Sequence, residues 1–248
     1  MAGAKRDGGG VMHLDLSTFE GRLNAITARM AAAAARAGRE ADAVSLLAVS
    51  KTYGPERITE AFEHGLQFFG ESRVQEAVEK IPQCPGRIRW HFIGHLQRNK
   101  VKYVLPLFDM VHSVDSLALL EMLEAGCQAT GEQIRVCLQV NVSGERCKFG
   151  MPPDVVPSVL DASTGMSGVS VEGLMTIPPF DPDPEAARPF FAHLRQLSEK
   201  MRLEEGFQLD HLSMGMSHDF EVAIEEGATL VRIGSALFGP RGKVKSHG

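Results

Sequence analysis

The feature that most constrains the fold is a pattern that recurs along the chain. A short apolar run is followed by a polar break and then by a segment with the 3.6-residue periodicity of an amphipathic helix. Most runs are continuous rather than alternating, which is typical of strands buried on both faces of a parallel sheet. We predict strands at 44–50, 67–71, 88–94, 110–115, 135–143, 169–177, 211–216 and 229–234.

The segments between the runs have room for crossover helices. These segments are 55–65, 72–80, 97–104, 116–130, 153–163, 187–205 and 218–227. Eight such units favour a closed barrel over an open doubly wound sheet, and the Gly-rich turn that opens a dinucleotide-binding sheet is missing. A length of 248 residues suits one barrel, although two small domains would also fit. The sequence therefore predicts an α/β fold with a single (β/α)₈ TIM-type barrel.

An alanine-rich stretch before the first run predicts an extra N-terminal helix. It extends from Ser17 to about Arg39, with Ser17 or Thr18 as the N-cap and Gly38 as the stop signal. Residues 1–12 are rich in Gly and Ala and lack periodicity. We therefore expect a flexible leader at 1–12, the barrel at 13–243 and a tail at 244–248.

Charge and cysteine content exclude several classes of function. The net charge is -5 and the basic residues are scattered, so no nucleic-acid partner is expected. No run approaches the ~20 apolar residues of a membrane span, and the first ten residues lack the apolar core of a secretory signal. We therefore expect a cytoplasmic protein that does not bind a membrane. Because the four cysteines form no C-x-x-C pair, we predict neither a metal site nor disulfides and expect the cysteines to be buried.

Small and polar residues gather where the last two runs end. The carboxyl ends of barrel strands share one face, and phosphate groups commonly bind there after the seventh and eighth strands. Here those ends have the sequences SMGMS (213–217) and VRIGS (231–235). Small side chains let a ligand approach the backbone, and a following helix would turn its N–H groups toward an anion. The residues that predict a phosphate site are Ser213, Gly215, Ser217, Gly234 and Ser235.

Lys51 closes the first run and is expected to project into the barrel mouth. The apolar residues before it would bury the amine, and burial favours the neutral form of a lysine. A neutral amine attacks an aldehyde to form an imine, which is how a lysine binds pyridoxal 5′-phosphate (PLP). Taken alone, the residue better fits a strand end whose lysine reaches solvent, and the neighbouring site residues favour the imine.

Arg232 stands in an otherwise apolar run and needs a hydrogen-bond acceptor, because a guanidinium cannot lose its charge. The pyridine nitrogen of PLP would serve. An arginine donor would leave that nitrogen unprotonated and weaken the ring as an electron sink. The alternative pairs Arg232 with a buried carboxylate such as Glu172 or Glu71.

Seven segments in unbroken order resemble the YggS/PROSC family of PLP homeostasis proteins. They are AVSKT (48–52), FGESRVQE (69–76), WHFIGHLQRNK (90–100), QVNVSGERCKFG (139–150), GLMTI (173–177), SMGMSHDFEVAI (213–224) and VRIGSALFG (231–239). The resemblance implies a fold like the N-terminal barrel of bacterial alanine racemase. One departure is Ser72, where the family usually has asparagine.

The resemblance also implies a role for each site residue. Lys51 would be the Schiff-base lysine, and Arg232 would lie near the pyridine nitrogen. Asn141 and Met216 would lie close to the ring. The phosphate would bind near three residues, Ser217, Gly234 and Ser235.

Two classes of PLP function remain open, and a third class of ligand is possible. A racemase needs an acid or base on each face of the substrate carbon, and Lys51 supplies one. Alanine racemases take the other, a tyrosine, from a second domain, for which this chain has no length after the eighth run; its own tyrosines are Tyr53 and Tyr103. We therefore expect a monomeric, non-catalytic carrier that delivers PLP to PLP-dependent apo-enzymes. The third alternative is a phosphorylated sugar bound by an aldolase-like Lys51.

Overall fold

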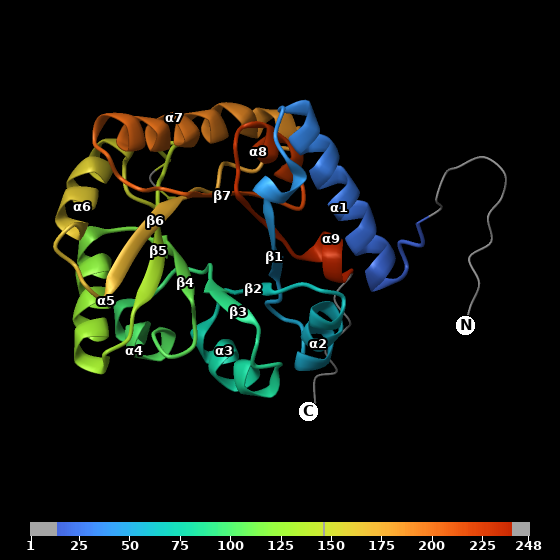
Figure 1. Ribbon diagram of the computed structural model, residues 1–248, viewed down its shortest axis with the longest axis horizontal. Coiled ribbons are helices and arrows are strands. Elements are labelled where there is room, and N and C mark those ends of the chain that lie inside the picture. The colour runs from blue at the N-terminus through green and yellow to red at the C-terminus, as the bar shows by residue number, and fades with distance from the viewer. Residues whose placement is uncertain (1–13, 146, 240–248) are drawn as a thin grey trace.

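The computed structural model describes residues 14–145 and 147–239. Its parallel strands follow one another around a closed barrel, and β8 pairs with β1 (Figure 1). The strands are β1 (Ser45–Val49), β2 (Phe68–Glu71), β3 (Arg89–Phe92), β4 (Met110–Val114), β5 (Ile134–Gln139), β6 (Val169–Met175), β7 (His211–Met216) and β8 (Leu230–Ile233). Seven of the eight predicted runs contain one of these strands, and the run at 135–143 overlaps β5, which begins one residue earlier, at Ile134. The single TIM-type barrel is therefore confirmed.

Helices follow the strands and cover the outside of the barrel. They are α1 (Phe19–Arg36), α2 (Pro55–Glu63), α3 (Val74–Lys80), α4 (Val101–Val104), α5 (Leu117–Thr130), α6 (Val156–Ser163), α7 (Arg188–Glu204), α8 (Phe220–Glu225) and α9 (Ser235–Phe238). The predicted helix at 97–104 is a 3₁₀ turn, Arg98–Lys100, followed by the single turn of α4. The helix periodicity of that segment therefore marks the right place but overstates its length.

The extra N-terminal helix is present as α1. The Thr18 hydroxyl accepts a hydrogen bond from the Gly21 N–H at 3.0 Å, and Gly38 follows the helix with a φ of +66°. In Figure 1, α1 lies beside α8 and α9. The Arg22 side chain donates to the Leu237 carbonyl at 2.8 Å, so α1 is joined to the segment that follows β8.

The core has two parts. Residues such as Phe69, Phe92 and Phe191 fill the layer between barrel and helices, whereas Met110, Cys137, Met175 and Leu230 form a smaller cluster. Burial on both sides of the strands explains why their sequences are continuous apolar runs.

The run predicted at 135–143 extends past the end of β5. Asn141 Oδ1 accepts hydrogen bonds from the Ser143 hydroxyl and the Gly144 N–H, which turns the chain away from the sheet. The strand therefore ends at Gln139.

Four cysteines are free thiols, and they differ in exposure. Cys127 and Cys137 are buried and Cys84 is half-buried, but Cys147 is exposed in the loop after β5, so the expectation that all four are buried is wrong for Cys147. Within 14–145 and 147–239, no group of His, Cys, Asp and Glu could hold a metal ion. None of the helices described there is long and apolar enough to cross a membrane. The predicted leader and tail lie outside the described residues.

Candidate cofactor-binding site

A cavity of about 310 Å³ lies where β1, β7 and β8 end. Six residues that were not predicted for the site line this cavity: Val49, Tyr53, Ser72, Ile93, Ile177 and His218. Of the seven residues predicted for the site, it brings together Lys51, Met216, Ser217, Arg232, Gly234 and Ser235. Because these residues are up to 184 positions apart in the chain, the closed barrel is what makes them neighbours.

Lys51 follows β1 and lines the cavity, but its side chain is exposed. The expectation that the preceding apolar residues bury it is therefore wrong. Val49 is the last residue of the strand, and the chain forms a turn at Lys51 and Thr52. Within the described residues the Lys51 amine makes no hydrogen bond, so it is free to meet an aldehyde in the cavity.

Arg232 is the buried charge of the cavity, with 4% of its surface exposed. Its guanidinium donates from Nη1 to the Ser213 hydroxyl at 2.7 Å and from Nη2 to the Thr176 carbonyl at 2.9 Å. Burial lowers the pKa of Arg232 to about 10, which still leaves it charged at neutral pH. A guanidinium has five N–H donors, so these two bonds leave donors for a ligand such as a pyridine nitrogen.

The carboxylate alternative for Arg232 is wrong. Glu71 pairs with Lys80 at 3.0 Å, and Glu172 lies 3.7 Å from Arg135. The acceptors of Arg232 among the described residues are neutral oxygens, which suits an arginine that must also interact with a ligand.

A chain of buried polar groups extends from Arg232 into the barrel. Because Arg232 donates to the Ser213 oxygen, the Ser213 hydroxyl hydrogen is available for Nδ1 of His112, 2.7 Å away. His112 Nε2 lies 2.8 Å from His91 Nδ1. Burial lowers the pKa of His91 to about 3 and that of His112 well below its usual value, so both rings are neutral. Each hydrogen bond is therefore donated in the same direction, from Arg232 through Ser213 and His112 to His91.

The sequence analysis did not predict this chain of hydrogen bonds. It assigned Ser213 to a phosphate site, whereas Ser213 is fully buried and bonded to Arg232 and His112. The available signal was His112 itself, an imidazole in the buried strand MVHSV. A polar residue in a buried strand needs a partner inside the barrel.

The two glycines of the predicted phosphate site differ in what they do. Gly215 has a φ of +89°, and a Cβ there would lie 2.5 Å from the Ala223 Cβ. It therefore serves the close packing of α8 on β7 and does not line the cavity. Gly234 does line the cavity, together with Ser235 at the start of α9.

The N-terminus of α8 is less suited to an anion than expected. The Asp219 carboxylate precedes the helix and accepts a hydrogen bond from the Met216 N–H at 2.6 Å. Glu221 pairs with Arg29 at 2.7 Å on the outside of the barrel. These acidic residues have structural roles, and the phosphate position near Ser217, Gly234 and Ser235 stays a prediction.

Asn141 does not line the cavity. Its Nδ2 donates to the Glu145 carbonyl at 2.9 Å, and its Oδ1 accepts from Ser143 and Gly144. The side chain thus holds its own loop, and its predicted contact with a cofactor ring stays a prediction.

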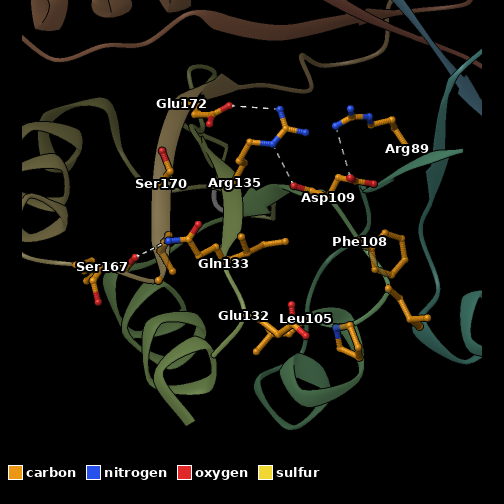
Figure 2. A pocket seen from close by; sticks show the side chains of 16 residues that line it. Arg89, Leu105, Phe108, Asp109, Glu132, Gln133, Arg135, Ser167, Ser170 and Glu172 are labelled. Atoms are coloured by element: carbon orange, nitrogen blue, oxygen red, sulfur yellow. Dashed lines mark hydrogen bonds and ion pairs between the residues drawn. The ribbon is translucent and has the colours of Figure 1, made fainter. Parts of the chain in front are cut away.

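A more voluminous pocket, of about 730 Å³, lies at the other end of the barrel. It is lined by the starts of β3, β5 and β6 and contains none of the predicted site residues. Figure 2 shows that its charged side chains face one another: Arg89 lies 3.9 Å from Asp109, and Arg135 lies 3.7 Å from Glu172. Because these charges are already paired, and because barrel active sites lie at the carboxyl ends of the strands, the smaller cavity is the candidate site.

Comparison with known proteins shows the family to which the chain belongs. Residues 22–242 match the family described as alanine racemase, N-terminal domain. A pyridoxal phosphate homeostasis protein of Aquifex aeolicus is 44% identical over 221 residues, which cover 89% of this chain and 97% of the relative. The human pyridoxal phosphate homeostasis protein is 38% identical, with 88% of this chain and 85% of the relative covered.

A solved structure is similar as well. PipY of Synechococcus elongatus, determined with PLP bound, superposes with a TM-score of 0.78 at 33% identity, covering 90% of this chain and all of PipY. The resemblance predicted from seven sequence segments is thereby confirmed. The chain belongs to the alanine racemase N-terminal domain family and, within it, to the pyridoxal phosphate homeostasis proteins.

Proposed function

We propose that this protein binds PLP as a Schiff base on Lys51 and acts in intracellular PLP homeostasis without catalytic turnover. The observation that carries the proposal is the meeting of an unengaged amine, Lys51, and a buried guanidinium, Arg232, in one cavity. The names of the relatives and the PLP bound to PipY support the choice of ligand.

Three groups of the cofactor, the aldehyde, the pyridine nitrogen and the phosphate, have a partner of suitable chemistry. The Lys51 amine adds to the aldehyde carbon, and the aldehyde oxygen leaves as water, which forms the imine. Arg232 donates to the pyridine nitrogen, while Ser217, Gly234 and Ser235 supply small side chains and backbone N–H groups for the phosphate. Arginine at the pyridine nitrogen limits the electron-sink chemistry that PLP supplies, which supports a carrier.

The alternative is a racemase, which would need a second acid or base besides Lys51. In the described lining, Tyr53 and His218 are the candidates for that role. The Tyr53 hydroxyl donates to the Gly239 carbonyl at 2.8 Å, and its ring stacks on Phe238. His218 lies 3.0 Å from the Asp181 carbonyl through Nε2. Both groups are engaged with backbone carbonyls, which favours the carrier over the racemase.

The binding proposal is tested by adding PLP to the purified protein. We expect a violet absorbance band and, after borohydride reduction and peptide mapping, a pyridoxyl group on Lys51. Lys51→Ala should lose both, whereas Lys102→Ala, which removes an exposed lysine of α4, should keep both. A phosphorylated sugar in place of PLP would give no such band. Labelling elsewhere, or an uncoloured protein, would overturn the proposal.

The carrier proposal is tested separately. Incubation with L-alanine and other amino acids should yield no D-isomer at enzymatic rates, and turnover that disappears in Lys51→Ala would establish a racemase. We further propose that the protein is a monomer of the cytoplasm that hands PLP to apo-enzymes. Recovery of activity in an apo-enzyme mixed with the loaded protein, faster than with the same amount of free PLP, would support this delivery.

A further inference from the structure

The backbone on both sides of Lys51 is held by one ion pair. Lys80 Nζ donates to the carbonyl of Ser50, the residue before Lys51, at 3.1 Å. Glu76 Oε1 accepts from the N–H of Thr52, the residue after Lys51, at 2.6 Å. Lys80 and Glu76 also pair directly at 2.5 Å. Two side chains of α3 therefore connect to the two peptide groups that flank the reactive lysine.

The lysine of this pair is buried, which makes the arrangement rigid. Lys80 has 7% of its surface exposed and also pairs with the fully buried Glu71 at 3.0 Å. Glu71 in turn accepts from the Ser50 hydroxyl at 2.7 Å. All three protons of the Lys80 ammonium are thereby used, so the group has one well-defined position.

Thr52 has a backbone conformation that needs such support. Its φ is +70°, and Thr52 is the one non-glycine residue with positive φ in the described part of the chain. A β-branched residue rarely adopts this left-handed conformation, because its Cβ is crowded by the backbone. The hydrogen bond to Glu76 offsets this strain and keeps the turn after β1 in place.

We propose that Glu76 and Lys80 are positioning residues that fix the Lys51 amine over the cavity for imine formation. The amine has no hydrogen bond of its own within the described residues, so the backbone held by Glu76 and Lys80 sets the point from which the side chain reaches the cavity. The proposal rests on the proposed function, in which the Lys51 nitrogen bonds to the aldehyde carbon of PLP and the aldehyde oxygen leaves as water. It assigns roles to two residues that do not line the cavity.

Two ligands separate positioning from general binding. PLP reports imine formation, through the rate and extent of the violet band. Pyridoxine 5′-phosphate has an alcohol in place of the aldehyde and reports non-covalent binding alone. Glu76→Ala should slow imine formation by about tenfold, the equivalent of one lost charged hydrogen bond, and leave the Kd for pyridoxine 5′-phosphate within about twofold. Glu79→Ala, an exposed carboxylate on the same helix, is the matched control and should change neither.

A second substitution tests the role of Thr52. Glycine adopts positive φ at no steric cost, so adding Thr52→Gly to Glu76→Ala should recover part of the lost rate. If Glu76→Ala does not fold, Glu76→Gln carries the test. It keeps an acceptor for the Thr52 N–H but loses the charge that Lys80 needs, and it should slow imine formation by about threefold.

The outcomes distinguish this proposal from the proposed function. If the unmodified protein forms no imine with PLP, the proposed function fails. If it forms the imine and the folded Glu76 variant does so at the same rate, the positioning role alone is overturned. An equal loss of affinity for both ligands, or a double variant no faster than Glu76→Ala, would also overturn it.

Discussion

The Ser213 hydroxyl lies 2.7 Å from Nη1 of Arg232, and both residues are buried inside the barrel. The same hydroxyl lies 2.7 Å from Nδ1 of His112. A single oxygen thus connects the charge that faces the cavity to a neutral histidine. The orientation of the guanidinium, and with it the proposed contact to a pyridine nitrogen, depends on this serine.

Removing that hydroxyl should affect both the fold and the ligand. Ser213→Ala leaves Nη1 of Arg232 and Nδ1 of His112 each without its buried partner, so we expect a loss of about 1–3 kcal/mol in the free energy of unfolding. PLP affinity should fall as well, because the guanidinium becomes free to turn. Urea unfolding and a PLP titration measure the two effects. The matched control is Ser170→Ala, an exposed serine of β6, which should stay within about 0.5 kcal/mol of the unmodified protein. Equal stability of the two variants would contradict the hydrogen-bond chain.

The buried histidines predict a pH dependence of stability. Burial lowers the pKa of His91 to about 3, whereas an unfolded histidine titrates near 6.5. Below pH ~6.5 the unfolded chain therefore takes up protons that the folded protein does not, and the free energy of unfolding falls as pH falls toward about 3. Above that window these groups contribute no pH dependence.

Urea unfolding between pH 8 and pH 4 checks this prediction, since the window lies between the two pKa values. Carboxylates also titrate at the acidic end, so the comparison is with His91→Asn, which carries no titrating ring. The variant should show a shallower decline from pH ~6.5 downward. Parallel curves for the two proteins would mean that His91 does not stay neutral in the fold.

The order of the strands was predictable because burial on both faces leaves a strong sequence signal. Apolar runs such as LLAV in β1, and LVRI in β8 with Arg232 as its one polar residue, indicate buried strands in a chain with helix-periodic segments between them. The carboxyl ends of these strands also predicted that Lys51 and Arg232 meet. Both inferences depend on the position of a residue along a strand, which the sequence contains.

What the sequence did not predict is the partner of each side chain. Ser213 bonds Arg232 rather than a phosphate, Asn141 holds its own loop, and Lys51 is exposed rather than buried. These outcomes depend on which residues of other strands lie across the barrel and on how the chain turns after a strand. Strand register and turn geometry decide them, and neither is visible in a local sequence pattern.

A substitution at Gly215 tests whether this glycine serves the packing of α8 on β7 rather than a phosphate site. A Cβ at this position would lie 2.5 Å from the Ala223 Cβ, and its φ of +89° disfavours any side chain. Gly215→Ala should therefore lower the free energy of unfolding by at least about 2 kcal/mol, through the packing of α8 on β7. Gly165→Ala is the control, because nothing lies within 4 Å of a Cβ there, and it should keep the stability of the unmodified protein. A stable Gly215→Ala that has lost only PLP affinity would restore the phosphate interpretation of this glycine.

Ser235 tests where the phosphate binds. The residue is exposed, lines the cavity and begins α9, so a negative charge there would face a dianionic phosphate at close range while disturbing little of the core. Two like charges about 4 Å apart repel by roughly 4 kcal/mol in the partly polar surroundings of a protein surface. Ser235→Asp should therefore weaken PLP binding by more than about tenfold, even after salt screens part of the repulsion. Pyridoxal, which has no phosphate, should lose much less, and Ser170→Asp near the opposite end of the barrel should alter neither ligand. If PLP and pyridoxal weaken equally, Ser235 contacts another part of the cofactor, and if neither changes, the phosphate does not bind at the start of α9.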